Sequence, residues 1–179
     1  SKELPILSYK IDSTGNKSYY TIKYMGFEDQ FGQDFNSSHL EDKIYLANFF
    51  FTRCPSICPP MRQALINLSD ELDGFVIVSH TIDPDYDSSE ILLAYAETTG
   101  AASDRWIFLR SSEANTKALA TQYMTNFRPY EDGTDFYHSS YASLVDGSGQ
   151  IRGFYNLLVK EDTNRLKDDI RLLIRISSQ

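Results

Sequence analysis

The sequence predicts an α/β domain built on a mixed β-sheet. Residues 44–51 form an almost continuously apolar run, which is typical of a strand buried on both faces of a parallel sheet. Residues 75–82 form a second run, which also predicts a strand. A segment with apolar residues at helical spacing follows each of these runs. Near the end of the chain, Asp-Gly-Ser-Gly at 146–149 separates two strand-like segments, which predicts an antiparallel hairpin.

The first part of the chain is expected to form two hairpins ahead of the main sheet. Residues 6–11 and 19–25 alternate between apolar and polar side chains around a turn signal at 12–16. They predict an N-terminal β-hairpin, an extension of the domain within about residues 1–26. Residues 27–35 contain a second turn signal and predict another short hairpin.

Strands and helices then alternate. The strand at 44–52 leads into a helix over about 59–73. Pro59 and Pro60 suit the first turn of that helix, and Gly74 suits its end. The remaining elements are expected as a strand at 75–82, a helix from Ser88 or Ser89 to Gly100, a strand at 105–109, a helix at 112–124, strands at 141–145 and 151–156, and a helix at about 162–176. This order fits a thioredoxin-like topology, a central mixed sheet flanked by helices, in a single domain over residues 1–179.

Composition and charge narrow the class of protein. The 179 residues are 41% hydrophobic and 13% aromatic, which is enough for a sizeable folded core. Acidic residues outnumber basic ones by 25 to 17, the net charge is −8, and no basic cluster is present. Nucleic acid is therefore a poor candidate partner. No apolar stretch of the sequence has the length of a membrane span.

Both cysteines, Cys54 and Cys58, lie where the first buried strand gives way to a helix. The dipole at a helix N-terminus favours thiolate, the form that binds soft metals and attacks disulfides. Positions i and i+4 share a helical face, so both sulfurs can reach one ion, and the same spacing permits a disulfide. The pair is thus a metal site, a redox pair or both. A structural zinc site would need a fourth ligand, and two small buried residues without chemistry are the plain alternative.

Three segments of the chain carry recognisable signatures. They are FFTRCPSICP at 50–59, VSHTIDPDYD at 78–87 and HSSYASLVDGSG at 138–149. Together they resemble the Sco/SenC family of copper proteins, whose patterns are F-T-x-C-P-x-x-C-P, S-I-D-P-x-x-D and H-S-x-x-x-x-L-V-D-x-x-G. The resemblance extends in order over about residues 25–175 and departs at His80, where small residues are more usual in the family.

The resemblance implies a thioredoxin-like fold and a place outside the cytoplasm, on the bacterial periplasmic side or in the mitochondrial intermembrane space, with a membrane anchor upstream of Ser1. It implies copper, as Cu(I) or Cu(II), bound by Cys54, Cys58 and His138. The implied partners are the copper-bearing subunit of cytochrome c oxidase or another copper acceptor, and a thiol–disulfide reductant. Asp83 is a candidate to support the site through a hydrogen bond to a ligand or to the cysteine loop, or else to begin the Asp-Pro turn.

Two functions remain open from the sequence. In the first, the protein is a metallochaperone that delivers copper to the dinuclear copper site of cytochrome c oxidase through the Cys-x3-Cys pair and His138. In the second, it is a thiol–disulfide oxidoreductase in which Cys54 and Cys58 reduce the cysteines of that copper site or of another extracytoplasmic protein. The three residues between the cysteines, and the lack of a proline in residues 139–141, differ from ordinary thioredoxins. A peroxidase of the peroxiredoxin type fits less well.

The other two histidines, His39 and His80, are not expected to bind metal. His39 lies in a polar connector and is expected in solvent. His80 lies near the carboxyl end of a core strand, where α/β proteins place their sites, but a buried and hydrogen-bonded histidine is the simpler expectation.

Overall fold

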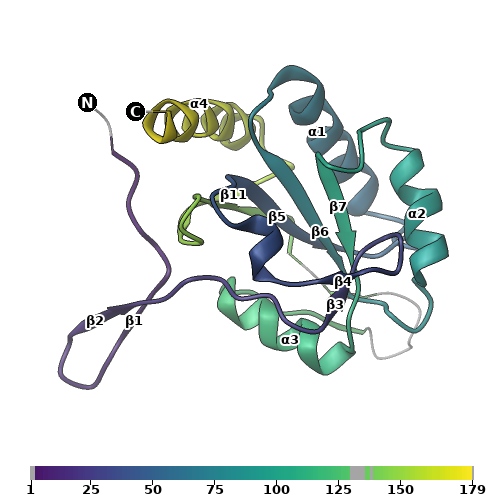
Figure 1. Cartoon of the computed structure of the whole chain (residues 1–179), viewed down its shortest axis with the longest axis horizontal. Coiled ribbons are helices and arrows are strands. Elements are labelled where there is room, and N and C mark those ends of the chain that lie inside the picture. Colours follow the sequence, from purple (N-terminus) through teal and green to yellow (C-terminus); the bar gives the residue numbers. More distant parts are fainter. Residues whose placement is uncertain (1–2, 130–135, 138, 179) are drawn as a thin grey trace.

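The computed structural model describes residues 3–129, 136–137 and 139–178. Figure 1 shows a central sheet with helices on both sides, and a hairpin near the N-terminus that projects away from this body. The predicted α/β architecture is confirmed in the described residues, and the details below concern what positions the two cysteines.

The central sheet runs in the order β11-β10-β5-β6-β7 in the described part of the chain. The strands β5 (Tyr45–Phe50), β6 (Val76–Thr81) and β7 (Trp106–Leu109) are parallel. The strand β10 (Tyr141–Val145) pairs antiparallel with β5 and with β11 (Ile151–Asn156). Every residue of β5 is buried, as its almost continuously apolar run predicted. The sheet is therefore mixed, with parallel strands on one side and the hairpin on the other.

The α-helices found in the described residues are α1 (Cys58–Glu71), α2 (Ser89–Glu97), α3 (Glu113–Gln122) and α4 (Lys160–Ser177). Right-handed crossovers between the parallel strands place α1 and α2 on the same face of the sheet. Lys167 of α4 forms a 2.7 Å ion pair with Glu71 of α1, so α4 joins that face. The helix α3 lies on the opposite face (Figure 1).

The helices α1 and α2 end at Glu71 and Glu97, shortly before their predicted ends at about 73 and at Gly100. Local signals mark the start of α2 and the turn after α1. Ser88 rather than Ser89 caps α2, because its hydroxyl accepts a hydrogen bond from the backbone N–H of Ile91 at 3.3 Å. Gly74 follows α1 with a φ of +87°, and a Cβ atom placed on it would lie 3.0 Å from the side chain of Ile174 in α4. Glycine suits the left-handed backbone there, and a larger residue would also require the Ile174 side chain to shift.

The N-terminal hairpins are present, but the first is shorter than the alternation suggested. Its strands are β1 (Tyr9–Ile11) and β2 (Lys17–Tyr19), and the second hairpin consists of β3 (Phe27–Glu28) and β4 (Asp34–Phe35). Beyond β2 the backbone turns to other partners: the N–H of Lys23 donates to the side-chain oxygen of Gln122 at 2.8 Å. Contacts with the body of the molecule thus override the local pattern.

Smaller elements were not expected from the sequence. A 3₁₀ turn, η1 (Ser37–Leu40), precedes β5, and two short strands, β8 (Arg128–Pro129) and β9 (Phe136–Tyr137), pair with each other. Among the helices that the structure describes, none is both long enough and apolar enough to cross a bilayer.

Candidate metal centre

The cysteine loop connects β5 to α1 at the carboxyl edge of the parallel strands. Cys54 is 8% exposed, and Cys58, the first residue of α1, is 4% exposed. The backbone N–H of Cys54 donates to the carbonyl of Phe51 at 3.2 Å, so the chain turns directly after the strand. Both cysteines are thus largely shielded from water. The positive end of α1 favours negative charge on a nearby sulfur, whereas shielding from water opposes it.

A buried carboxylate, Asp87, holds the start of this loop. Its side chain accepts hydrogen bonds from both the backbone N–H of Thr52, at 3.2 Å, and the Thr52 hydroxyl. It also accepts from the hydroxyl of Thr81, the last residue of β6, at 2.5 Å. Burial raises the pKa of Asp87, and the bonds from Thr52 and Thr81 act against that rise. Asp87 was not singled out from the sequence, although it is the final acidic residue of the D-P-x-x-D pattern.

Asp83 contacts the same loop one residue further on, at Arg53. Its carboxylate accepts from the guanidinium of Arg53 at 2.7 and 3.2 Å, and Arg53 in turn lies over the ring of Tyr86 at 4.0 Å. The hydrogen bond with Asp83 raises the pKa of Arg53. Asp83 is nearly buried whereas Arg53 is half exposed, so this pair orients the loop more than it stabilises the fold. Two of the three acidic residues at 83–87, Asp83 and Asp87, therefore hold the residues just before Cys54.

Replacing Asp87 with asparagine should lower the free energy of unfolding by about 1–3 kcal/mol, because a buried amide cannot accept from all three donors that the carboxylate satisfies. Urea denaturation monitored by circular dichroism measures this loss. The matched control is Asp85→Asn, an exposed acidic residue in the same turn, which should change stability by less than about 0.5 kcal/mol. Equal stability of the two variants would remove Asp87 from its structural role.

The predicted third ligand, His138, lies outside the described residues. The chain soon after position 138 forms β10, which pairs with β5: Ser143 is opposite Ala47, and Val145 is opposite Tyr45. Because β10 is antiparallel to β5, its first residue, Tyr141, lies toward the carboxyl end of β5, the end that leads into the cysteine loop. Within the described residues, no three His, Cys, Asp or Glu side chains converge to hold a metal ion.

Comparisons with known proteins show the family and the fold of this chain. The sequence model of the SCO1/SenC family matches residues 15–175. The chain belongs to the SCO1/SenC family. A curated relative, the SCO1 protein homolog of Bacillus subtilis, is 28% identical over 143 residues, which cover 76% of this chain and 74% of the relative.

Solved structures of other members of the SCO1/SenC family share the fold. One is BsSco, described as having a disulfide switch and as a member of a family of cytochrome c oxidase assembly proteins. It matches with a TM-score of 0.76 at 24% identity, over 99% of both chains. Another is ScoI of Arabidopsis thaliana with copper bound, with a TM-score of 0.73 at 24% identity, over 86% of this chain and 98% of the other. The predicted thioredoxin-like fold is confirmed.

His80, the departure from the SCO1/SenC pattern, is fully buried, and both of its ring nitrogens are engaged. Nδ1 lies 2.8 Å from the carbonyl of Asn48, which can only accept, so Nδ1 carries the proton. Nε2 then accepts from the hydroxyl of Tyr24 at 2.6 Å, and that hydroxyl lies 2.7 Å from the hydroxyl of Tyr123. Burial lowers the pKa of His80 to about 4. A neutral histidine with both nitrogens occupied is not available to a metal, in agreement with the plain expectation for this residue.

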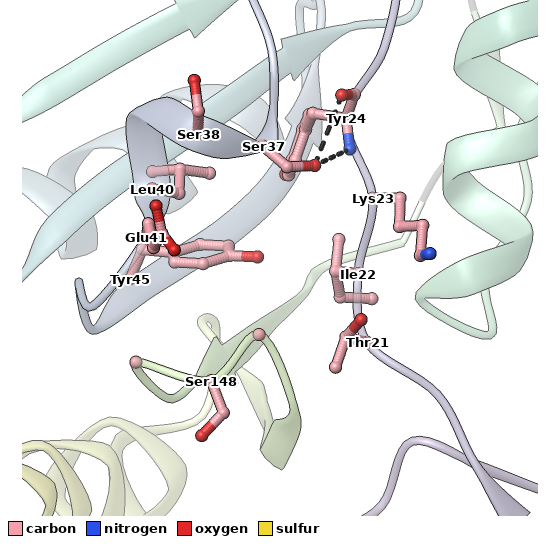
Figure 2. A pocket seen from close by; sticks show the side chains of 12 residues that line it. Thr21, Ile22, Lys23, Tyr24, Ser37, Ser38, Leu40, Glu41, Tyr45 and Ser148 are labelled. Atoms are coloured by element: carbon pink, nitrogen blue, oxygen red, sulfur yellow. Dashed lines mark hydrogen bonds between the residues drawn. The ribbon is translucent and has the colours of Figure 1, made fainter.

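A separate pocket of about 360 Å³ lies at the other end of β5 (Figure 2). Tyr45, the first residue of β5, and Tyr24 form part of its wall, and the Ser37 hydroxyl accepts from the N–H of Tyr24 at 2.7 Å. The cysteine loop follows the last residue of β5, Phe50, about 16 Å away along the strand. The pocket and the cysteines thus lie at opposite edges of the sheet, and we assign this pocket no part in chemistry at the thiols.

Proposed function

We propose that the protein is a copper chaperone that binds one copper ion through Cys54, Cys58 and His138 and delivers it to the dinuclear copper site of cytochrome c oxidase. The observation that carries this proposal is the pair of buried thiols in one braced loop, at the edge where the chain after position 138 enters the sheet. The copper-bound ScoI of Arabidopsis thaliana and the oxidase-assembly description of BsSco support it.

The ligand set suits copper as a cargo. Two thiolates and one imidazole are soft to intermediate donors, which bind Cu(I) in preference to hard cations. Three ligands leave the ion open to attack by a donor from an acceptor protein, so copper passes by exchange of one ligand at a time. Asp87 and Asp83, which hold the residues before Cys54, keep the first sulfur in place while the exchange proceeds.

A second candidate function is reduction of a disulfide in the acceptor, which the disulfide switch of BsSco favours. In this reaction one thiolate attacks the acceptor disulfide, and the second thiolate resolves the mixed disulfide. Cys54 and Cys58 together lose two electrons, and the two acceptor cysteines gain them. The oxidised pair has no thiolates left for copper, so the two functions exclude each other at any one moment and are linked by the redox state of the pair.

The proposal includes a location and partners. The copper-bearing subunit of cytochrome c oxidase, or another copper acceptor, receives the metal, and a separate thiol–disulfide reductant keeps Cys54 and Cys58 reduced. The protein works outside the cytoplasm, held at the membrane by an anchor, on the periplasmic side in bacteria or in the mitochondrial intermembrane space.

Anaerobic mixing of the Cu(I)-loaded protein with the reduced soluble copper-binding domain of the oxidase subunit tests the proposal. We expect copper to move to that domain while the thiol count of both proteins stays constant. Loss of the third ligand in His138→Ala should lower the Cu(I) affinity by more than about 10-fold, measured by competition with a chelator, because loss of a group that only supports a ligand already costs about 10- to 100-fold. His39→Ala, which alters an exposed histidine, is the matched control and should bind as the wild type does.

The opposite pattern would favour the reductase. It consists of no transfer of copper, rapid reduction of an oxidised acceptor domain, and loss of two thiols from the protein for each disulfide reduced. In that case His138→Ala would leave the rate of disulfide reduction unchanged.

A further inference from the structure

A cavity of about 270 Å³ lies between the central sheet and the chain that leaves α3. Its floor is made of alternate residues on three neighbouring strands, which are Ala47 and Phe49 of β5, Ser143 of β10 and Phe154 of β11. Alternate residues of a strand point to the same face of a sheet. The residue after Phe154, Tyr155, donates to the carboxylate of Asp169 in α4 at 2.7 Å, so the floor faces away from α4 and towards α3 (Figure 1).

Two small side chains create this hollow. Ala47 of β5 is opposite Ser143 of β10, and Ser143 is opposite Phe154 of β11. Larger residues at positions 47 and 143 would fill the space, whereas alanine and serine leave it open beside the rings of Phe49 and Phe154. The cavity is therefore a consequence of the sequence at two positions that face each other in the sheet.

The cavity has aromatic walls and opens to solvent on one side. The ring of Tyr123, which is 2% exposed, lines it from the end of α3. Met124 and Tyr141 also line it and are 51% and 49% exposed, so they mark its open side. None of the described residues that line the cavity is charged. A ligand that fits here is uncharged, because no group of opposite charge would compensate for its loss of water.

The Ser143 hydroxyl is a polar group on the floor of the cavity. Its side chain shares a face of β10 with Tyr141, two residues before it, which also lines the cavity. Ser143 is only 6% exposed, and within the described part of the chain its hydroxyl forms no hydrogen bond. A buried hydroxyl without a partner destabilises a fold. A ligand with an oxygen atom beside Ser143 would supply the partner.

We propose that this cavity binds a small neutral molecule with one aromatic ring and one hydroxyl or carbonyl oxygen, which accepts a hydrogen bond from Ser143. An apolar cavity of about 150 Å³ already holds benzene, so the larger space here has room for a ring with its substituents. The rings of Phe49, Tyr123 and Phe154 offer edge-to-face and stacked contacts to such a ligand.

This binding site does not rest on the proposed copper function. Cys58 lines a different pocket together with Phe50. Because Phe49 and Phe50 are consecutive in β5, their side chains point to opposite faces of the sheet. Binding of the aromatic molecule and binding of copper can therefore be measured separately.

Methionine-methyl NMR with p-cresol as the probe tests the site. In ¹³C-methyl-labelled protein, p-cresol should shift the Met124 signal in a saturable manner, with a Kd of about 1 mM or below. The other two methionines are internal controls, because neither lines the cavity. Met25 is 79% exposed and Met61 is 1% exposed, and the signals of both should stay in place.

The variant Ser143→Ala isolates the hydrogen bond. It should weaken the binding of p-cresol about fivefold and leave the binding of toluene, which lacks the hydroxyl, within about twofold of wild type. Ser18→Ala, which alters an exposed serine of β2, is the matched control and should bind both probes as the wild type does. Ser143→Ala should melt at the wild-type temperature or above it, because it removes a buried hydroxyl that has no partner.

Three results would overturn the proposal. One is the absence of a saturable shift up to the solubility limit of p-cresol, which a cavity that holds only water would give, or an equal shift of the Met25 signal. Another is equal affinity of p-cresol for wild type and Ser143→Ala, since Ser143 would then not donate to the ligand. The third is a lower melting temperature of Ser143→Ala, which would show that the hydroxyl already has a partner within the fold.

Discussion

Replacing Cys58 with serine should lower the Cu(I) affinity by more than about 100-fold, beyond what loss of a supporting group around a metal usually costs. A serine hydroxyl is a hard, neutral donor and does not replace a thiolate on Cu(I). The same loss is expected for Cys54→Ser, because both sulfurs follow the end of β5 in one loop. Anaerobic competition with a Cu(I) chelator measures the affinity of each variant.

The control for this prediction lies between the two cysteines. Ser56 is exposed, and Ser56→Ala should retain wild-type affinity. Because Cys54 and Cys58 are buried, serine also places an additional polar group in a shielded position, at a cost of about 1–3 kcal/mol of folding stability. Melting curves of both variants are therefore needed, and a folded Cys58→Ser protein with wild-type copper affinity would contradict the proposed site.

The unfolding free energy should fall as pH is lowered from about 6.5 to about 4, and His80 should account for a large share of the loss. The pKa of His80 is about 4 in the folded protein and about 6.5 in the unfolded chain. Between these values the unfolded state binds the extra proton, so each pH unit of acidification costs about 1.4 kcal/mol. The whole window is worth about 3 kcal/mol, and above about pH 6.5 the contribution is fully present.

Urea denaturation at several pH values, in wild type and His80→Gln, isolates this contribution. Glutamine stays neutral, so the variant is less stable overall but should lose the component of the pH slope that belongs to His80. His39→Gln removes an exposed histidine and should keep the wild-type slope. Parallel slopes in wild type and His80→Gln would show that His80 does not titrate as its surroundings require.

The fold was predictable because its signals are local. The almost continuously apolar run at 44–51 marked β5, Ser88 marked the start of α2, and Gly74 marked the turn after α1. Each of these signals acts within its own segment or turn, so the element that it marks can be predicted without knowledge of the rest of the chain. The cysteine pair could be recognised as a candidate site for the same reason, since its spacing and its position at the start of a helix indicate thiol or metal chemistry.

The remaining features depend on contacts between distant residues. Thr52 and Asp87 are 35 residues apart, and neither segment has a sequence pattern that predicts a hydrogen bond between the Asp87 carboxylate and the cysteine loop. The first hairpin ended early because Lys23 found a partner at Gln122, 99 residues away. Met124 stands where a helix end prefers glycine, so a search for glycine after α3 would have missed this helix end.

The most direct measurement of the central claim is X-ray absorption at the copper edge of the Cu(I)-loaded protein. The proposal predicts one copper per chain with two sulfur neighbours and one nitrogen neighbour. One sulfur should disappear in Cys58→Ser, and the nitrogen should disappear in His138→Ala. A spectrum with only one sulfur neighbour, or one that is identical in wild type and His138→Ala, would contradict a site built from Cys54, Cys58 and His138.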